Sequence, residues 1–222
     1  MGLISIIDYG SGNLKSVYNA VNHLSNQKRK EKVVVTSSIS DIKDASHIIL
    51  PGVGSFQSCV KGLKRSSLVN VIQEKVCNFK TPFLGICVGM QMLASKGYEK
   101  GEFSGLDWIK GKVKKISDNN KNLKIPHMGW NDINFKVNTP FIENLKKKIN
   151  YNGQNRFSAY FIHSYNFLVS DQSEKILTTS YGQEITAMVS RENIIGTQFH
   201  PEKSHFFGLA FLQTFLESEE YR

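Results

Sequence analysis

The sequence predicts an α/β fold in which a mostly parallel central sheet is flanked by helices and followed by an antiparallel C-terminal extension. Over the first hundred residues, short apolar segments alternate with segments of helical periodicity, which is typical of parallel strands joined by helices. Later in the chain, apolar segments follow one another with only short turns between them, which favours antiparallel pairing. The chain has 222 residues, enough for one sizeable core, so we expect a single domain over residues 1–222.

In the first half, helices and strands are told apart by the spacing of their apolar residues. A helix is predicted over 13–24, where apolar residues recur every three or four positions. A longer helical segment covers 57–79 and is expected to break near Ser66, and another helix follows Cys87 and ends near Gly97. The strands expected between these helices cover residues 3–8, 33–36, 47–50 and 82–86.

The second half is expected to consist mainly of strands and to end in a helix. The last helix is predicted over 205–216, with Ser204 as its N-cap, because one face of this segment is strongly apolar. The expected strands cover residues 159–169, 175–181, 185–189 and 194–199.

Charge and cysteine content exclude several classes of protein. The formal net charge is +9, but the basic residues gather in three short runs, at 27–32, 110–115 and 146–148, which we interpret as solvated loops. No nucleic-acid-binding motif accompanies them, so we expect no nucleic-acid partner. No apolar run is long enough to span a membrane, so we expect no membrane partner. The three cysteines lack metal-ligand spacing, so we expect no metal or other cofactor, and they are too few for a disulfide framework, so we expect a reducing compartment. The first residues read as a strand without the basic region of a signal peptide, so we expect a cytoplasmic location.

Cys87 stands between two glycines, after an apolar strand and before a helical segment, in the sequence LGICVGMQML. This is the pattern of a nucleophile elbow, a sharp turn that lifts one side chain out of the sheet. The backbone N–H of Val88 would point at the same place and could stabilise an oxyanion. Gln91, four residues on, would lie on the same helix face and could hold the polar end of a substrate. Taken alone, the turn fits a tight strand-to-helix connection with a packed sulfur equally well.

A histidine and a carboxylate near the C-terminus offer the general base that a cysteine nucleophile needs. They occur in GTQFHPEKS, where Pro201 favours an extended conformation at His200. Residues two apart in an extended chain point the same way, so Glu202 can orient the His200 imidazole. Upstream, LPGVGSF predicts a glycine-rich turn whose backbone N–H groups can face an anion. Read alone, that turn carries no function.

Together these motifs resemble those of the class I, triad-type glutamine amidotransferases. The resemblance rests on PGVG, GICVGMQ and GTQFHPEKS, which occur in this order. Two further motifs, PHMGWN and YFIHSY, narrow it to the glutaminase subunits of imidazole glycerol phosphate synthase. The likeness extends from DYGSGN, at 8–13, to the final helix. It implies a flavodoxin-like fold.

The resemblance implies roles for individual residues. Cys87, His200 and Glu202 match a catalytic triad, and Val53 and Val88 match the oxyanion donors, of which the Val53 peptide must reorient. The positions that match a glutamine-binding site are Gly54, Gln91, Ser164 and Tyr165, and those that match a partner-facing surface are Asn13 and Trp130.

The resemblance also implies a partner and a reaction. Ammonia from glutamine would pass to a (β/α)8-barrel cyclase subunit, which converts PRFAR into imidazole glycerol phosphate and AICAR in histidine biosynthesis. A paralogous glutaminase that supplies ammonia for acetamidino sugars of surface glycans remains an alternative, because the partner chooses the acceptor. A catalytically silent binding module is a third reading, and the intact triad argues against it.

Overall fold

The protein was studied in a computed structural model that describes residues 2–28, 31–117, 123–150 and 157–218. An eight-stranded sheet of order β2-β1-β3-β4-β14-β13-β12-β9 forms its centre. The five strands from β2 to β14 pair in parallel, and the remaining three pair antiparallel. The predicted mostly parallel sheet with an antiparallel C-terminal extension is therefore confirmed.

The first half alternates strands and helices, as the apolar spacing predicts. Its elements are β1 Leu3–Ile7, α1 Leu14–Lys28, β2 Lys32–Thr36, α2 Ile39–Lys43, β3 His47–Gly52, α3 Phe56–Arg65, α4 Val69–Gln73, the π-helical turn η1 Glu74–Asn78, β4 Phe83–Cys87, α5 Val88–Gln91, β5 Lys96–Gly97 and β6 Phe103–Ser104.

The second half contains two small sheets in addition to the antiparallel edge of the main one. Its elements are β7 Gly111–Lys115, β8 His127–Asp132, β9 Asn134–Phe135, α6 Pro140–Asn150, β10 Ser158–His163, β11 Tyr165–Val169, η2 Gln172–Glu174, β12 Lys175–Ser180, β13 Glu184–Arg191, β14 Ile194–Thr197, η3 Pro201–Lys203 and α7 His205–Glu217. Strands β10 and β8 form a two-stranded sheet, and β11, β7, β5 and β6 form a four-stranded sheet.

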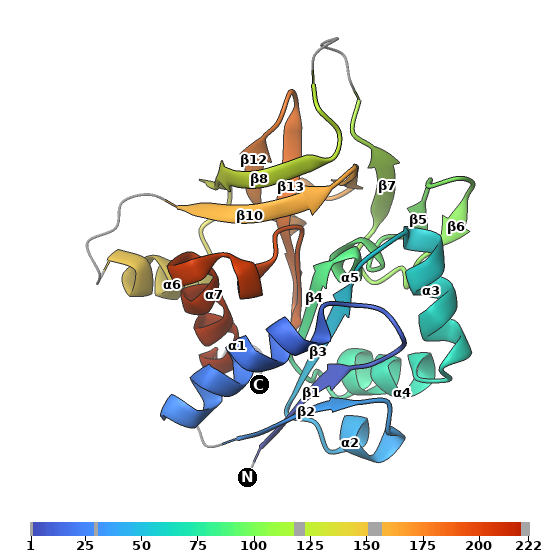
Figure 1. Ribbon diagram of the computed structural model, residues 1–222, viewed down its shortest axis with the longest axis vertical. Helices are drawn as coiled ribbons and strands as arrows, with labels where there is room; N and C mark the ends of the chain where they lie inside the picture. Colours follow the sequence, from blue (N-terminus) through green and yellow to red (C-terminus); the bar gives the residue numbers. More distant parts are fainter. Residues whose placement is uncertain (1, 29–30, 118–122, 151–156, 219–222) are drawn as a thin grey trace.

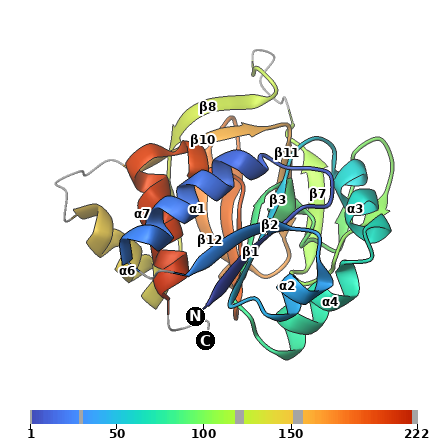
Figure 2. The same ribbon diagram turned by 60° about the horizontal axis from the view of Figure 1, so that its bottom comes forward.

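Helices cover both faces of the main sheet. Figures 1 and 2 show α1, α6 and α7 on one side and α2, α3 and α4 on the other. Strands β8 and β10 cross the top of the molecule in Figure 1, above the carboxyl ends of β3 and β4. In open parallel sheets this edge is where ligands bind.

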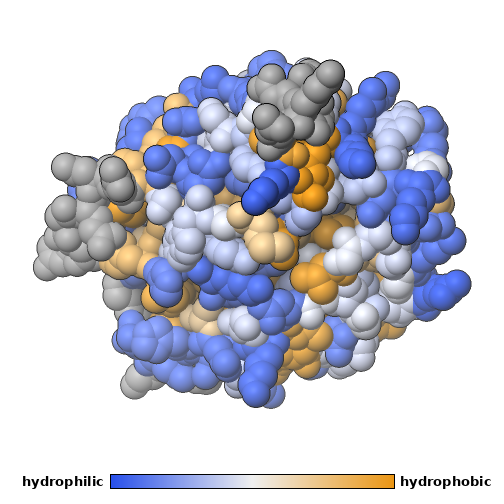
Figure 3. Space-filling view, turned by 45° about the horizontal axis from the view of Figure 1, so that its top comes forward, coloured by the Kyte–Doolittle hydropathy of each residue, from blue (hydrophilic) through white to orange (hydrophobic). Residues whose placement is uncertain are grey.

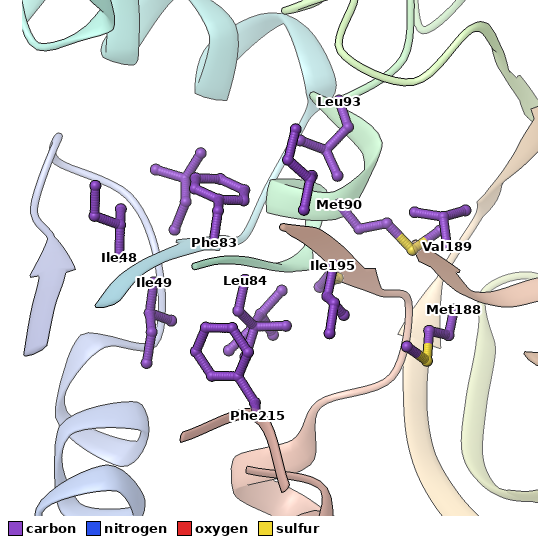
Figure 4. Packing of buried hydrophobic residues seen from close by; sticks show 14 of the residues in the cluster. Ile48, Ile49, Phe83, Leu84, Met90, Leu93, Met188, Val189, Ile195 and Phe215 are labelled. Atoms are coloured by element: carbon purple, nitrogen blue, oxygen red, sulfur yellow. The ribbon is translucent and has the colours of Figure 1, made fainter. Parts of the chain in front are cut away.

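The core follows from the alternation of side chains along the central strands. Ile48 pairs with Phe83 and Ile49 with Leu84, so successive residues of β3 and β4 point to opposite faces. Figure 4 shows Phe83 on the same side of the sheet as Leu93, and Leu84 on the side of Phe215 from α7. Because these strands are buried on both faces, they read as continuous apolar runs in the sequence.

Several predicted boundaries differ from the structure. The strand expected over 159–169 is two strands in different sheets, because the chain turns at Ser164. The helix expected after Cys87 is a single turn, Val88–Gln91. Ser204 is the N-cap residue of α7, but its side chain donates to the His200 carbonyl and makes no capping bond.

The interpretation of the basic runs as loops is wrong for two of them. The run at 110–115 contains all of β7, where buried Val113 stands between exposed lysines. The run at 146–148 lies within α6. Of the run at 27–32, residues 27 and 28 end α1, residue 32 begins β2, and residues 29 and 30 lie outside the described residues.

Among the residues that the structure describes, no helix is both long enough and apolar enough to cross a membrane.

Phe199 should be a principal source of stability, because its fully buried ring lies 5.3–6.0 Å from those of Phe161, Phe207 and Phe211. We expect Phe199→Ala to lower the free energy of unfolding by about 3–5 kcal/mol through the cavity it leaves. The same change at Phe79, which is 67% exposed, should cost no more than about 0.5 kcal/mol. Urea unfolding of both variants measures the difference, and equal losses would contradict the assignment.

Candidate active site

A cavity of about 250 Å³ lies at the carboxyl ends of the central parallel strands. It is bounded by the residues that follow β3, β4 and β14 and by the turn between β10 and β11. Eight of the residues singled out from the sequence line it: Val53, Gly54, Cys87, Val88, Gln91, Ser164, Tyr165 and His200. The fold therefore brings together four segments that are far apart in the sequence.

Cys87 occupies a strained turn at the end of β4. Its backbone has φ 56° and ψ −110°, a left-handed conformation that residues with a side chain rarely adopt. The turn is packed so closely that a Cβ at Gly89 would overlap the Leu50 carbonyl oxygen. This explains the glycine after Cys87, and it is the geometry of a nucleophile elbow.

The Gln198 side chain lies beside the thiol and is bonded to Gln91. Gln198 Nε2 lies 3.7 Å from Cys87 Sγ, and its Oε1 accepts a 2.9 Å bond from Gln91 Nε2. Gln91 Nε2 also donates to the Tyr165 carbonyl, so the Gln91 amide group is held in place and is 3% exposed. The sequence analysis did not select Gln198. A glutamine within a predicted apolar strand could have been a signal, because a buried amide group needs hydrogen-bond partners.

His200 follows β14 and faces the cavity with Cys87. Its Nδ1 lies 2.8 Å from Glu202 Oε1, and this bond leaves Nε2 to exchange a proton with another group. The Nε2 atom is buried and has no hydrogen-bond partner among the described residues. The backbone at His200 is extended, but the next residues form the turn η3. Glu202 therefore reaches His200 across a 3-10 turn and not along an extended chain.

The Glu202 carboxylate is buried, with a side chain that is 0% exposed. Asn13 Nδ2 donates to its Oε1 at 3.4 Å. Burial opposes the charged form of His200, but interactions with Cys87 and Glu202 outweigh this and raise the His200 pKa to about 10. The site therefore favours a protonated imidazole beside the sulfur, the form that can give a proton to a leaving group.

Val88 and Val53 both line the cavity that Cys87 borders. Val88 is the first residue of α5, directly after Cys87, and is 5% exposed. Since α5 has only four residues, the dipole of this helix at Cys87 is small. Val53 lies just beyond β3 and is 41% exposed.

The cavity wall also contains residues that sequence reasoning missed. Glu99 lines the cavity, and its Oε2 accepts a 2.7 Å bond from the backbone N–H of Phe56 at the start of α3. Lys203 lines it too, with its ammonium group 5.8 Å from the centre of the Tyr160 ring. Neither Glu99 nor Lys203 carries a sequence signal that would identify it as a site residue.

A pair of neutral histidines supports the wall behind Ser164 and Tyr165. His163 Nδ1 lies 2.8 Å from the Tyr165 carbonyl, which can only accept, so this nitrogen carries the proton. His163 Nε2 is then the acceptor for His127 Nδ1 at 3.0 Å, and His127 Nε2 accepts from Asn131 Nδ2. Burial lowers the pKa of His163 to about 3 and that of His127 to about 4.

Trp130 does not line the cavity. It lies on β8, 49% exposed, and its ring stacks on His205 with centroids 5.0 Å apart. Met128 on the same strand and Ile162 on β10 are also exposed. Figure 3 shows the face over these strands, where apolar side chains lie among polar ones.

Within the part of the chain that the structure describes, no group of three or more His, Cys, Asp or Glu residues could hold a metal ion.

A known protein family matches nearly the whole chain. The sequence model of the family described as "Glutamine amidotransferase class-I" matches residues 5–217. The chain belongs to this family of class-I glutamine amidotransferases.

Curated relatives narrow the assignment. Two proteins named "Imidazole glycerol phosphate synthase subunit HisH", from Pelagibacter ubique and Zymomonas mobilis, are each 44% identical to this chain over 96% of its length. The matched region covers 98% of the first protein and 95% of the second. The Rhodospirillum rubrum protein of the same name is 40% identical over 96% of this chain and 97% of its own. Within the family, the chain falls among the HisH subunits.

Solved structures support the fold. A chain described as a glutamine amidotransferase superposes with a TM-score of 0.64 at 17% identity, over 94% of this chain and 99% of that one. A glutamine amidotransferase from Thermotoga maritima gives 0.57 at 16% identity, over 90% of this chain and 76% of its own.

The neutral state of His163 predicts a specific loss of stability in acid. Its folded pKa lies below the ordinary value of about 6.5, so protons bind more tightly to the unfolded chain. As the pH falls below about 6.5 toward 3, this group should remove about 1.4 kcal/mol of unfolding free energy per pH unit. Urea unfolding between pH 6.5 and 4.5 should show a steeper decline for wild type than for His163→Gln. Parallel curves would contradict the prediction.

Proposed function

We propose that this protein is the glutaminase subunit of an imidazole glycerol phosphate synthase. It releases ammonia from glutamine and passes it to a (β/α)8-barrel cyclase subunit that forms imidazole glycerol phosphate and AICAR from PRFAR. The observation that carries the proposal is the shared cavity of Cys87, on its strained elbow, and His200, paired with Glu202. The proposal takes residues 1–222 as one cytoplasmic catalytic domain.

The chemistry follows from the positions of these groups. The Cys87 thiolate attacks the side-chain carbonyl carbon of glutamine, and the carbonyl electrons move to oxygen, which Val88 N–H stabilises. The C–N bond then breaks as His200 Nε2 gives a proton to the leaving nitrogen, which departs as ammonia. Water adds to the resulting γ-glutamyl thioester while His200 accepts a proton. Glutamate leaves and Cys87 is regenerated.

The remaining wall fits the rest of a glutamine molecule. The Glu99 carboxylate is a partner for the α-ammonium group, since opposite charges attract strongly in a partly closed cavity. We assign the α-carboxylate, which is on the same carbon as the ammonium group, to the turn at Ser164 and Tyr165 and to Gly54. The Gln91 carbonyl oxygen completes the polar lining.

The choice of pathway rests on the relatives. Those at 38–44% identity carry the HisH name, which favours histidine biosynthesis over the surface-glycan alternative. We assign the surface around Asn13 and exposed Trp130 to the cyclase, because partly exposed aromatic residues are frequent anchors of interfaces.

Replacing the nucleophile should end the reaction. We expect Cys87→Ala to lower glutamine hydrolysis by at least about 10³-fold, because no covalent intermediate can form. Cys77→Ala removes a thiol that borders a different cavity and should keep wild-type activity. Glutamate release measures both variants, with circular dichroism as a control for folding. Normal turnover by Cys87→Ala would refute the proposal.

The isolated subunit should be a slow glutaminase, because the Val53 peptide must reorient to complete the oxyanion site. Adding the barrel cyclase with its substrate should raise glutamine turnover by about 10²–10³-fold, the contribution of one oxyanion donor. A stopped assay of glutamate formation with and without the cyclase measures the ratio. Full activity of the subunit alone would contradict this prediction.

A further inference from the structure

The glycine-rich turn after β3 is held by three side chains from other parts of the fold. Tyr9, in the loop between β1 and α1, donates its hydroxyl to the Pro51 carbonyl at 2.9 Å. Ser11, from the same loop, donates to the Val53 carbonyl at 2.7 Å. The Cys59 thiol, on α3, approaches the Val53 carbonyl at 3.4 Å.

These side chains are lasting donors. Cys59 is fully buried and Tyr9 is 7% exposed, and burial raises the pKa of both groups above their ordinary values. Both therefore keep their protons at neutral pH. Ser11 Oγ also lies 3.5 Å from Cys59 Sγ, so the two groups that reach the Val53 carbonyl are in contact. The Ser11 bond itself is exposed, whereas the buried Tyr9 and Cys59 donors fix their peptides more firmly than solvent would.

The anchored carbonyls belong to the peptides on either side of the Gly52–Val53 peptide. Among the described residues, no side chain forms a hydrogen bond with the Gly52–Val53 peptide itself. Gly52 pairs with Cys87, and a Cβ there would come within 2.6 Å of Gly89 N, so this middle peptide lies against the elbow. With both neighbours fixed, rotation about the bonds flanking it turns this peptide alone.

We propose that Ser11, assisted by Cys59, is a positioning residue that anchors the Val53 carbonyl and so fixes where the Val53 N–H points when its peptide turns toward the substrate. This inference rests on the proposed function, in which that N–H stabilises the oxyanion. Ser11 does not touch the substrate and acts only through Val53. An anchor of this kind affects the transition state and not the binding of glutamine, because the oxyanion exists only during reaction.

The test compares Ser11→Ala with Ser11→Thr in the complex with the barrel cyclase. We expect Ser11→Ala to lower kcat for glutamine by about tenfold, since a small misplacement of a catalytic donor is costly, and to leave KM within about twofold. Ser11→Thr keeps the hydroxyl and should restore kcat. The matched control is Ser58→Ala, which removes a hydroxyl that bonds to Ser55 at the start of α3, and this variant should behave as wild type. An unchanged kcat in Ser11→Ala, or a raised rate that marks the hydroxyl as a brake, would overturn the proposal.

A second measurement is independent of activity. Hydrogen exchange over residues 51–55 should be faster in Ser11→Ala than in wild type and unchanged in Ser58→Ala. Equal exchange in all three proteins would overturn the anchoring. Failure of the proposed function would look different: wild-type turnover would be absent or would survive Cys87→Ala, whereas the exchange result would still decide whether Ser11 holds the turn.

Discussion

The close contact between the elbow and β3 is the constraint on which the site depends. Gly89 lies against the Leu50 carbonyl and Gly52 against the Gly89 nitrogen, so two backbones meet with no side chain between them. This contact holds Cys87 in a left-handed conformation that costs about 1–3 kcal/mol and persists only where the surroundings impose it. Parallel pairing of β4 with both β3 and β14 supplies that rigidity, and it also brings His200 to the sulfur.

Much of the central architecture could be predicted because local signals agree with the final environment. The apolar runs of β3 and β4 are buried on both faces, so their sequence leaves little choice of structure. Cys87 and His200 could also be identified as candidate site residues from local sequence, because the glycines around Cys87 and the proline after His200 indicate specific turns. These signals lie within a few residues of the groups that they mark.

Features that depend on long-range packing could not be predicted in this way. The segment that includes β10 and β11 reads as one apolar strand in the sequence. The turn at Ser164 becomes evident only from the structure, because the two strands join different sheets. Glu99 becomes part of the cavity because its carboxylate binds the start of α3, a contact 43 residues away in sequence. Gln91, which could equally be an exposed helix residue, is buried by Gln198 from β14's continuation. Each of these three features depends on a contact with a distant segment, which the local sequence does not reveal.

Because β14 pairs in parallel with β4, the site can form only after both strands have been synthesised. The elbow and its thiol lie at the end of β4, whereas the imidazole and the carboxylate follow β14, which is synthesised much later. A growing chain thus carries the sulfur long before it carries the base, and β14 must insert next to β4 before the two can meet. Under the proposed function, amide cleavage must therefore wait until β14 has been synthesised and has inserted beside β4.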